Sequence, residues 1–479
     1  MTLKNLLKKV NIIKHDVDMD VEVAGICYDS RKVKSGDVFV AIRGYDSDGH
    51  HFIESAMENG AVCVIAEEKP NVALPYILVE NTRVALAEIS AAWFDYPADK
   101  LVTIGVTGTN GKTTVTNIIK TIIEKCTGEK CGLIGTNQNL IGNIELPAAL
   151  TTPDSYCIFE MMAKMVSEGC RYAVMEVSSH ALIMHRTHGI IFDVAVFTNL
   201  TPEHLDFHGT MEDYAEAKSR LFKQCRAAAI NIDDPYAKYM TEGAECSFLT
   251  YAMNDAMADL VAKDIRLTDD KVQFCAVAIG SIDRVELGIP GLFSVYNALS
   301  AISAAILLGI DINDIIDALR DCIGVKGRAE RVPVETDYTV IIDYAHTPLA
   351  LKNIIMAVRG FAEGRVLTLF GCGGDRDKTK RSIMGEIAAE HSDFVIITSD
   401  NPRTEDPSVI IDEILIGINK LNLPHIRIDD RRAAIHYALD MAKTGDVLIL
   451  AGKGHETYQI LGKEKVHFDE REIVGEYLR

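Results

Sequence analysis

The stretch GVTGTNGKTT, residues 105–114, decides the fold of the central part of this chain. It follows the apolar run LVTIGV and precedes TTVTNIIKTIIEK, whose apolar spacing is that of an amphipathic helix. A glycine-rich turn between a strand and a helix presents backbone N–H groups and the positive helix end to phosphate. The glycines stand three apart, at 105, 108 and 111, whereas the standard loop has its first glycine where Val106 stands. The stretch therefore predicts a phosphate-binding loop of unusual spacing.

The side chains of this loop predict the nucleotide contacts. Lys112 is expected to reach the β- and γ-phosphates, and the Thr113 hydroxyl is expected to bind Mg²⁺. A glycine-rich turn that holds nothing is the alternative, but strand, GKTT and helix occur in register, which favours phosphate. The loop residues expected at the nucleotide are Gly108, Thr109, Asn110, Gly111, Lys112, Thr113 and Thr114.

Length and composition indicate a globular protein of several domains. The 479 residues exceed one core, and 48% hydrophobic with 25% charged residues is ordinary for soluble proteins. A net charge of −20 argues against a nucleic-acid partner, because binding nucleic-acid phosphates needs clustered Lys and Arg. Eleven cysteines without a C-x-x-C pair fit a reducing compartment. No run approaches 18 apolar residues, so we expect a cytoplasmic protein without membrane insertion.

Apolar runs that alternate with helical patterns predict an α/β protein of three domains. Residues 1–98 hold short strand-like runs, such as DVFVAI and YILVE, and end near the joint FDYPADK. In residues 99–329, YAVMEV, VAVFTNL and AAAIN predict a P-loop ATPase-like parallel sheet covered on both faces. Residues 330–479 predict a Rossmann-like sheet whose strands end in polar loops. Such sheets bind ligands beyond the carboxyl ends of their strands.

Two stretches after predicted strands of the central unit carry candidate metal ligands. Glu176 stands where YAVMEV should stop, so its carboxylate is expected to complete a metal shell; a solvent-facing strand end is the alternative. NLTPEHLDFHG concentrates His204, Asp206 and His208, a possible zinc set. No thiolates lie nearby, so a second Mg²⁺ or a nucleotide contact is favoured for His204. Asp206 and His208 are interpreted as loop hydrogen-bonding residues.

The motifs together resemble one family. The chain carries, in order and over nearly its whole length, GVTGTNGKTT, MEVSSHAL, TNLTPEHLDFHG, AKSRLF, YNALSA, GRAERV and DYAHTP. This set resembles the Mur ligases, the ATP-dependent amide ligases of peptidoglycan precursor synthesis, and most of all the members that add diaminopimelate. The three-residue glycine spacing is that family's form of the phosphate-binding loop.

The resemblance implies a mechanism. A substrate carboxylate attacks the γ-phosphate of ATP, and the acyl phosphate formed is then attacked by the incoming amine. Both reactants of the first step are anions, so Lys112, two Mg²⁺ ions and His204 are expected to neutralise charge. Lys218 matches the lysine that the family carbamylates with CO₂, although the bare sequence suggests an ordinary surface lysine. The implied metal ligands are Thr113, Glu176, His204 and carbamylated Lys218.

Further matched positions concern ATP and the uridine end of the substrate. Asn297, Arg328 and Asp343 match positions that hold the adenine, the phosphates and the ribose. Ser294 stands where many members carry Asn, which puts a nucleotide contact there in doubt. YDSRKVKSGDVFVAIRG matches the uridine-binding module, with Ser30 at the uridine contact. The loop that follows holds Tyr45, Asp46 and Ser47.

The central unit also matches contacts to the nucleotide-sugar substrate, UDP-N-acetylmuramoyl-L-Ala-D-Glu. Met184 replaces a Gln of some relatives, so that contact is expected to be lost or made by backbone. For the two threonines, a plain turn before Pro153 is the alternative. The matched residues are Thr151, Thr152, Ser178 and Arg186.

The third unit is expected to select the amino acid. Its strand-end loops combine arginines with carboxylate and amide acceptors, which suits the two carboxylates and two ammonium groups of meso-diaminopimelate. L-Lysine lacks the distal carboxylate, and an arginine facing its ammonium would repel it. A turn opened by Asp-Asn-Pro, with Arg403 as an exposed charge, is the alternative. The residues concerned are Arg376, Asp400, Asn401, Pro402, Arg403, Gly452 and Glu456.

Two rival functions stay open at this point. Folylpolyglutamate synthetase shares the ATP-binding core but lacks the uridine module, and a phosphate-loop switch or motor would hydrolyse ATP without any amino acid. The favoured interpretation is an ATP-dependent ligase that adds meso-diaminopimelate to the D-Glu carboxylate. We expect it to act as a monomer and to use ATP, Mg²⁺ and a CO₂-derived carbamate on Lys218.

Overall fold

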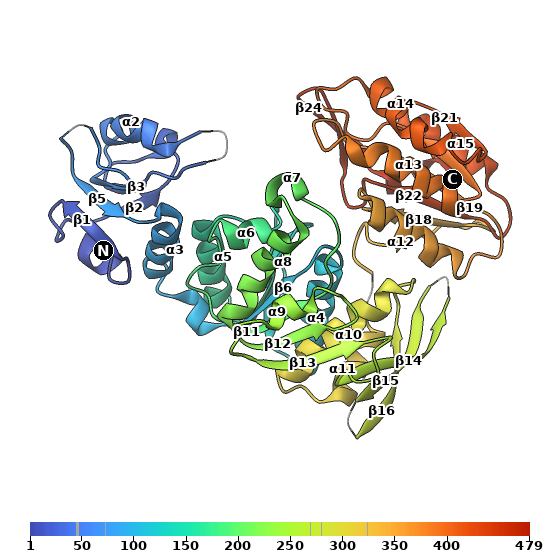
Figure 1. Ribbon diagram of the computed structural model, residues 1–479, viewed down its shortest axis with the longest axis horizontal. Coiled ribbons are helices and arrows are strands. Elements are labelled where there is room, and N and C mark those ends of the chain that lie inside the picture. The colour runs from blue at the N-terminus through green and yellow to red at the C-terminus, as the bar shows by residue number, and fades with distance from the viewer. Residues whose placement is uncertain (45–46, 72, 269, 279, 323) are drawn as a thin grey trace.

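The computed structural model describes residues 1–44, 47–71, 73–268, 270–278, 280–322 and 324–479. Three α/β units follow one another along the chain, each built on its own sheet (Figure 1). Tyr45 and Asp46, expected in the loop after the uridine module, lie outside the described residues. None of the helices within those ranges combines the length and apolar character that a bilayer crossing requires.

A five-stranded sheet with the order β1-β5-β4-β3-β2 forms the first unit. All its neighbours pair in parallel except β1, which runs antiparallel to β5. The runs DVFVAI and YILVE lie in β3 and β5, and they are apolar because hydrophobic clusters cover both faces of the sheet. The elements are α1 (Leu3–Leu6), β1 (Ile12–Asp16), β2 (Gly25–Cys27), β3 (Asp37–Val40), α2 (Ile53–Glu58), β4 (Cys63–Ala66), β5 (Tyr76–Val79) and α3 (Thr82–Trp93).

The central unit holds an eleven-stranded sheet with the order β16-β15-β14-β13-β12-β11-β6-β10-β7-β8-β9. Its strands are β6 (Val102–Thr107), β7 (Lys130–Ile134), β8 (Asn139–Ile141), β9 (Ile144–Leu146), β10 (Cys170–Glu176), β11 (Phe192–Phe197), β12 (Cys225–Asn231), β13 (Ser247–Ala252), β14 (Leu260–Leu267), β15 (Val272–Ala278) and β16 (Ser281–Leu287). The strands from β14 to β7 in this order pair in parallel.

Both edges of this sheet depart from the predicted parallel arrangement. β15 and β16 at one edge, and β8 and β9 at the other, pair antiparallel, so the sheet is mixed. Only Gly142 and Asn143 separate β8 from β9, and so short a connection can join only antiparallel strands. The predicted parallel sheet is therefore confirmed in its central strands, and antiparallel strands extend it at both edges.

Helices cover both faces of the central sheet, as the apolar strands predict. One buried cluster joins the sheet to helices α4 (Lys112–Thr127), α10 (Phe293–Leu307) and α11 (Ile312–Arg320). A second cluster on the other face includes helices α5 (Ser155–Ser167), α8 (Met211–Ser219) and α9 (Ala237–Thr241). The short helices α6 (Ser179–Ile183) and α7 (Leu205–His208) follow β10 and β11.

The third unit has a six-stranded sheet with the order β17-β18-β22-β19-β20-β21. Apart from the antiparallel edge strand β17, its neighbours pair in parallel. The elements are β17 (Glu330–Arg331), β18 (Thr339–Asp343), α12 (Pro348–Arg359), β19 (Val366–Phe370), α13 (Thr379–His391), β20 (Phe394–Ile397), α14 (Pro407–Ile418), β21 (His425–Arg427), α15 (Arg431–Met441), β22 (Val447–Ala451), the hairpin β23 (Tyr458–Leu461) and β24 (Glu464–His467), and α16 (Glu470–Tyr477).

This topology determines where ligands can bind. β6 lies between β10 and β11, so the strand order reverses beside it, and the chain leaves β6 into the phosphate loop. In the third unit, the loops after β18, β19, β20 and β22 all leave the carboxyl edge of one sheet. Both positions are the usual ligand crevices of open α/β sheets.

Candidate active site

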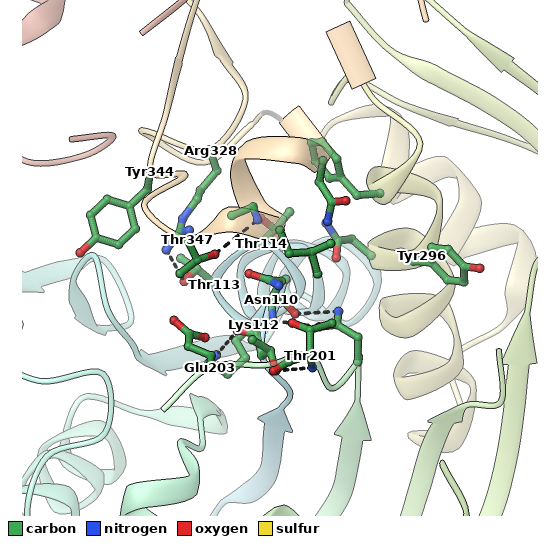
Figure 2. A pocket seen from close by; sticks show the side chains of 18 of the residues that line it. Asn110, Lys112, Thr113, Thr114, Thr201, Glu203, Tyr296, Arg328, Tyr344 and Thr347 are labelled. Carbon is green, nitrogen blue, oxygen red and sulfur yellow. Dashed lines mark hydrogen bonds between the residues drawn. The ribbon is translucent and has the colours of Figure 1, made fainter. Parts of the chain in front are cut away.

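A cavity of about 540 Å³ opens between the central and third units. Figure 2 shows Lys112, Thr113 and Thr114 at the start of α4, with Arg328, Tyr344 and Thr347 from the later part of the chain around them. Its wall also contains Glu176, Glu203, Asn297 and Asp343. The cavity therefore joins residues that lie more than two hundred positions apart in the sequence.

The structure explains the unusual glycine spacing. Gly105 lies inside β6, where a Cβ atom would come within 3.0 Å of the Phe192 ring, so this glycine serves packing. Gly108 has φ +150°, and a Cβ there would lie 1.9 Å from Thr198 Oγ1. Gly111 has φ +87°, a left-handed conformation that favours glycine. Gly108 and Gly111 thus form the loop, and Gly105 belongs to the strand before it.

Two lysines meet at one backbone carbonyl of this loop. Lys112 Nζ donates to the carbonyl oxygens of Gly108 at 2.9 Å and Thr109 at 2.8 Å, and Lys218 Nζ donates to the same Gly108 oxygen at 2.9 Å. Lys218 is 1% exposed, so it is not the surface lysine that the bare sequence suggests. Burial, and then the charge of Lys112, lower the pKa of Lys218 well below its usual range. The amine is therefore unusually ready to lose its proton.

Glu176 connects the phosphate loop to the next strand-end loop. Its Oε1 accepts from Thr113 Oγ1 at 3.0 Å and from the Thr136 backbone N–H at 2.8 Å. The Thr136 hydroxyl donates to Oε2 at 3.0 Å, and its oxygen lies 3.0 Å from the Thr151 hydroxyl, which can donate to it. Glu176 is 1% exposed, which excludes a solvent-facing strand end. A buried carboxylate beside a threonine hydroxyl is an oxygen pair suited to Mg²⁺.

The loop after β11 turns Glu203 and His204 toward the lysines. His204 has φ +57°, and its Nε2 lies 3.8 Å from Glu203 Oε1. Burial alone would raise the pKa of Glu203, but the nearby His204, His346 and Lys112 lower it below its usual range. Burial also lowers the pKa of His204. An anionic carboxylate thus lies close to the phosphate loop.

The other residues of that loop have different partners. His208 Nε2 lies 2.9 Å from Ser179 Oγ, and its ring stacks on Tyr214 with the centroids 4.7 Å apart. Asn199 Oδ1 accepts from the Asn110 backbone N–H at 2.9 Å, which holds the phosphate loop from the side. His208 is accordingly a hydrogen-bonding residue of the loop.

The residues expected at the nucleotide surround the same cavity. Asn297 lies against Gly111, where an added Cβ would approach its Oδ1 to 2.5 Å. Arg328 Nη2 donates to Thr113 Oγ1 at 3.4 Å and its guanidinium lies 4.8 Å from the centre of the Tyr344 ring. The carboxylate of Asp343 accepts from the Ala329 N–H at 2.7 Å, and burial raises its pKa.

Ser294 does not line this cavity. Its hydroxyl donates to the Pro290 carbonyl at 2.9 Å, and the residue is fully buried. This hydrogen bond connects the first turn of α10 to the residues that precede the helix.

A second polar cluster lies beside the cavity, on the central unit. The Thr152 hydroxyl donates to the Glu176 carbonyl at 2.8 Å and accepts from the Ser178 N–H at 3.0 Å. Arg186 Nη1 donates to the Thr152 carbonyl at 2.8 Å and its Nη2 approaches Met184 Sδ at 3.5 Å. The four residues expected at the nucleotide sugar are thus brought together, with Thr151 at the cavity wall.

Ser30 lies apart from this cluster, in the first unit. It is 9% exposed, and the Asn59 side chain donates to its carbonyl at 3.0 Å. Two side-chain contacts join the first unit to the central one. The Tyr28 hydroxyl lies 3.7 Å from Cys157 Sγ, and Glu88 Oε1 lies 2.9 Å from His188 Nε2. The cavity and the Ser30 site belong to different units.

The strand-end loops of the third unit converge. Arg403 Nη1 donates to the Gly374 carbonyl at 2.8 Å, and Asn401 Nδ2 donates to Glu456 Oε2 at 2.8 Å. Gly452 lies so close to Asp400 that a Cβ would reach its Oδ2 within 2.7 Å.

The two arginines of these loops differ in exposure. Arg376 is exposed and donates to the Asp375 carbonyl at 3.0 Å. Arg403 is half-buried with φ +54°, so it is more constrained than an exposed turn residue. Pro402, between Asn401 and Arg403, is buried.

Sequence reasoning missed Thr136 and gave Glu203 no role. Thr136 follows β7 in GTNQN, a loop that carries no charge or unusual spacing. The one signal in the sequence that could have indicated Thr136 is its position at the end of a predicted strand. Glu203 is next to His204 in a stretch that the sequence already indicates, and its partial burial, with a side chain 19% exposed, distinguishes it from an ordinary loop acid.

Family models match most of the chain. The model described as "Mur ligase family, catalytic domain" matches residues 22–106, "Mur ligase middle domain" matches residues 106–305, and "Mur ligase, glutamate ligase domain" matches residues 327–454. These matches confirm the resemblance that the motifs carry.

Two curated relatives are similar to the chain over its whole length. The UDP-N-acetylmuramoyl-L-alanyl-D-glutamate--2,6-diaminopimelate ligase of Caldanaerobacter subterraneus subsp. tengcongensis is 48% identical, over 100% of this chain and 99% of the relative. The protein of the same name from Clostridium tetani is 45% identical, over 100% and 99%.

Solved structures agree with this assignment. A structure of a ligase of that name is 32% identical with a TM-score of 0.73, over 100% of this chain and 98% of the other. Folylpolyglutamate synthase from Mycobacterium tuberculosis shares the fold at 16% identity and a TM-score of 0.63, over 78% and 92%. The chain therefore belongs to the Mur ligase family of ATP-dependent ligases.

Proposed function

We propose that this chain joins an amino group of meso-diaminopimelate to the D-Glu carboxylate of UDP-N-acetylmuramoyl-L-Ala-D-Glu, with ATP converted to ADP and phosphate. The observation that carries the proposal is a nucleotide cavity whose wall includes the third unit, the unit on which three strand-end loops converge. The names of the similar ligases support the same substrates.

The proposed chemistry follows from the charges around the cavity. The D-Glu carboxylate attacks the γ-phosphate, which gives an acyl phosphate and releases ADP; the amine then attacks the acyl carbon and phosphate leaves. The first step brings two anions together, so the ammonium of Lys112 and the guanidinium of Arg328 oppose their repulsion. Asn297 and Asp343 are proposed to hold the adenine and the ribose, and Gly108 to Thr114 the phosphates.

The buried oxygens beside the phosphate loop fit Mg²⁺. Thr113 Oγ1 and Glu176 Oε1 lie 3.0 Å apart, and hard oxygen ligands with one negative charge are what Mg²⁺ prefers beside a triphosphate. We propose these two residues, with His204 and a carbamate on Lys218, as the residues that would hold up to two ions. Mg²⁺ supplies charge neutralisation on the phosphates when bound.

The polar clusters outside the cavity are proposed to bind the other substrates. Thr151, Thr152, Ser178 and Arg186 would contact the nucleotide sugar near its peptide, and Ser30 its uridine. Arg376, Asp400, Asn401, Pro402, Arg403, Gly452 and Glu456 would bind diaminopimelate. We further propose boundaries near residues 98 and 329, a monomeric state and a cytoplasmic location.

The amino-acid dependence of phosphate release tests this function. Purified protein receives ATP, Mg²⁺ and UDP-N-acetylmuramoyl-L-Ala-D-Glu with either meso-diaminopimelate or L-lysine, and the product is identified by mass. We expect fast phosphate release and a new amide product with meso-diaminopimelate, and neither of these with L-lysine. Faster turnover with lysine would overturn the specificity, and release with no amino acid would favour a motor. Failure to use the nucleotide sugar would favour a folylpolyglutamate-type ligase.

Replacing Arg403 by alanine is expected to weaken diaminopimelate binding. A charged hydrogen bond to a carboxylate is worth about 2 kcal/mol, so the KM for diaminopimelate should rise roughly thirty-fold. The KM for the nucleotide sugar should stay nearly constant, because its proposed contacts lie on other units. Steady-state kinetics with one substrate varied at a time measures both. An equal rise in both KM values would contradict the assignment.

A further inference from the structure

Lys453 is a buried ammonium between two loops of the third unit. It directly follows Gly452 after β22, and its side chain is 0% exposed. Its Nζ lies 3.0 Å from Asn401 Oδ1 and 3.1 Å from Glu456 Oε2. The rings of Tyr458 and Phe468 flank it, with centroids 5.8 Å and 5.9 Å away. No role was predicted for this residue from the sequence.

The contacts of Lys453 belong to a closed network. Asn401 Nδ2 donates to Glu456 Oε2 at 2.8 Å, and Asn401 Oδ1 accepts from the Ile460 backbone N–H at 3.0 Å. Glu456 Oε2 thus receives one hydrogen bond from the amide and one from the ammonium. The network links the loop after β20, the loop after β22 and the hairpin strand β23. The two loops carry all of the proposed diaminopimelate contacts except Arg376.

The main effect of this network is to orient the side chains of Asn401 and Glu456, and its contribution to the stability of the fold is small. A buried ion pair gives little net stability, because desolvation of the two charges offsets their attraction. Apolar residues of similar size often replace such pairs without loss of stability. The specific consequence of the ammonium is that it holds one carboxylate oxygen of Glu456 and one amide oxygen of Asn401 in fixed places. Since its side chain is fully buried, Lys453 can act on a ligand only through these neighbours.

We propose that Lys453 is a positioning residue for the incoming amino acid. It fixes the Glu456 carboxylate that receives an ammonium group of the substrate, and it ties the loop of Asn401 to the loop of Glu456. This inference rests on the proposed function, because Glu456 is taken as a contact of the amino-acid substrate.

The test replaces Lys453 by methionine in the full-length enzyme. Residues that orient metal ligands by hydrogen bonds are typically worth about tenfold to hundredfold in affinity or activity, and we expect the KM for meso-diaminopimelate to rise by a similar factor. The KM for ATP, the KM for the nucleotide sugar and kcat at saturating diaminopimelate should change less than about threefold, because the network touches neither of those proposed sites.

A double variant separates positioning from general structure. If Lys453 acts through Glu456, the double variant with Lys453→Met and Glu456→Gln should show a KM no higher than the worse single variant. Additive losses, or an unchanged KM in Lys453→Met, would overturn the proposal. Should the methionine variant fail to fold, Lys453→Gln keeps a donor for Asn401 without the charge and is measured in the same way, with the same two outcomes.

Arg365→Met is the matched control. Arg365 pairs with Asp446 at 2.6 Å in the same unit, but both precede their strands, β19 and β22, at the amino edge of the sheet. We expect this variant to lower the melting temperature without raising the KM for diaminopimelate. An equal rise in KM for both variants would mark the Lys453 effect as nonspecific. If the wild-type enzyme makes no amide with diaminopimelate, the proposed function fails. If the wild type makes the amide and the Lys453→Met variant has the same KM as the wild type, only the positioning role fails.

Discussion

Replacing Lys112 by methionine is expected to abolish measurable ligation. A cation acting on the transferring phosphoryl group is worth roughly 10³- to 10⁵-fold in kcat in phosphoryl-transfer enzymes, and Lys112 is the ammonium that the phosphate loop holds at the cavity wall. Its two hydrogen bonds go to loop carbonyls, which keep the charge in place before the nucleotide arrives. Phosphate release with all three substrates present measures the loss.

The control for Lys112 lies on the same helix. Lys125, in the last turn of α4, is exposed and pairs with Asp321 at 3.0 Å. Lys125→Met should keep nearly the full rate, since an exposed ion pair contributes at most about 1 kcal/mol to stability. A Lys112→Met enzyme that keeps more than a tenth of the wild-type rate would contradict the proposed charge neutralisation.

Loss of Lys218 is expected to be almost as severe, and arginine should not replace it. In the proposed modification, the free amine would react with CO₂ to give a carbamate and a proton, which would place an anion beside the phosphate loop in place of a cation. Lys218→Ala and Lys218→Arg should each lose about 10³-fold in kcat, because both remove the carboxylate-like group that would support charge at the reacting centre. If the lysine acted as a cation, the arginine variant would stay active.

The depressed pKa of Lys218 gives this prediction a pH dependence. Only the unprotonated amine has the lone pair that attacks CO₂, and the lowered pKa makes more of it available near neutral pH. Carbamate occupancy should therefore fall as the pH falls through the folded-state pKa, and it should rise with added bicarbonate. With ¹³CO₂, a carbamate signal should appear in the wild type and in Lys223→Ala, an exposed-lysine control, but not in Lys218→Ala. Activity independent of CO₂ would contradict the modification.

The sequence predicts the fold best where strand, turn and helix signals coincide. The phosphate loop, Glu176 at the end of β10 and the alternation of the parallel strands all follow from local patterns. The antiparallel edges were missed because short edge strands such as β8 and β9 carry little periodic signal. Which residues meet when they lie far apart in the sequence, such as Arg328 and Thr113, depends on packing that no local pattern records.

Burial is the other property that the sequence does not reveal. Lys218 and Lys453 have no local signature, and each becomes informative only when its surroundings are known. The resemblance to the family predicts a role for Lys218, but no sequence feature predicts one for Lys453, although Glu456 lies three positions away. Thr136 shows the same limit, because a threonine in a neutral loop becomes important only through its two bonds to a buried carboxylate.

The nucleotide cavity has one wall that belongs to the unit proposed to carry the amine. Tyr344 and Thr347 contribute to this wall, and the same unit carries the proposed amino-acid loops. Nucleotide bound in this cavity would therefore contact both units, and we expect its binding to favour the arrangement that brings the amine to the acyl group. If the third unit closes in this way, we expect product release to require its reopening, so that the movement of one whole unit would help to set the turnover rate.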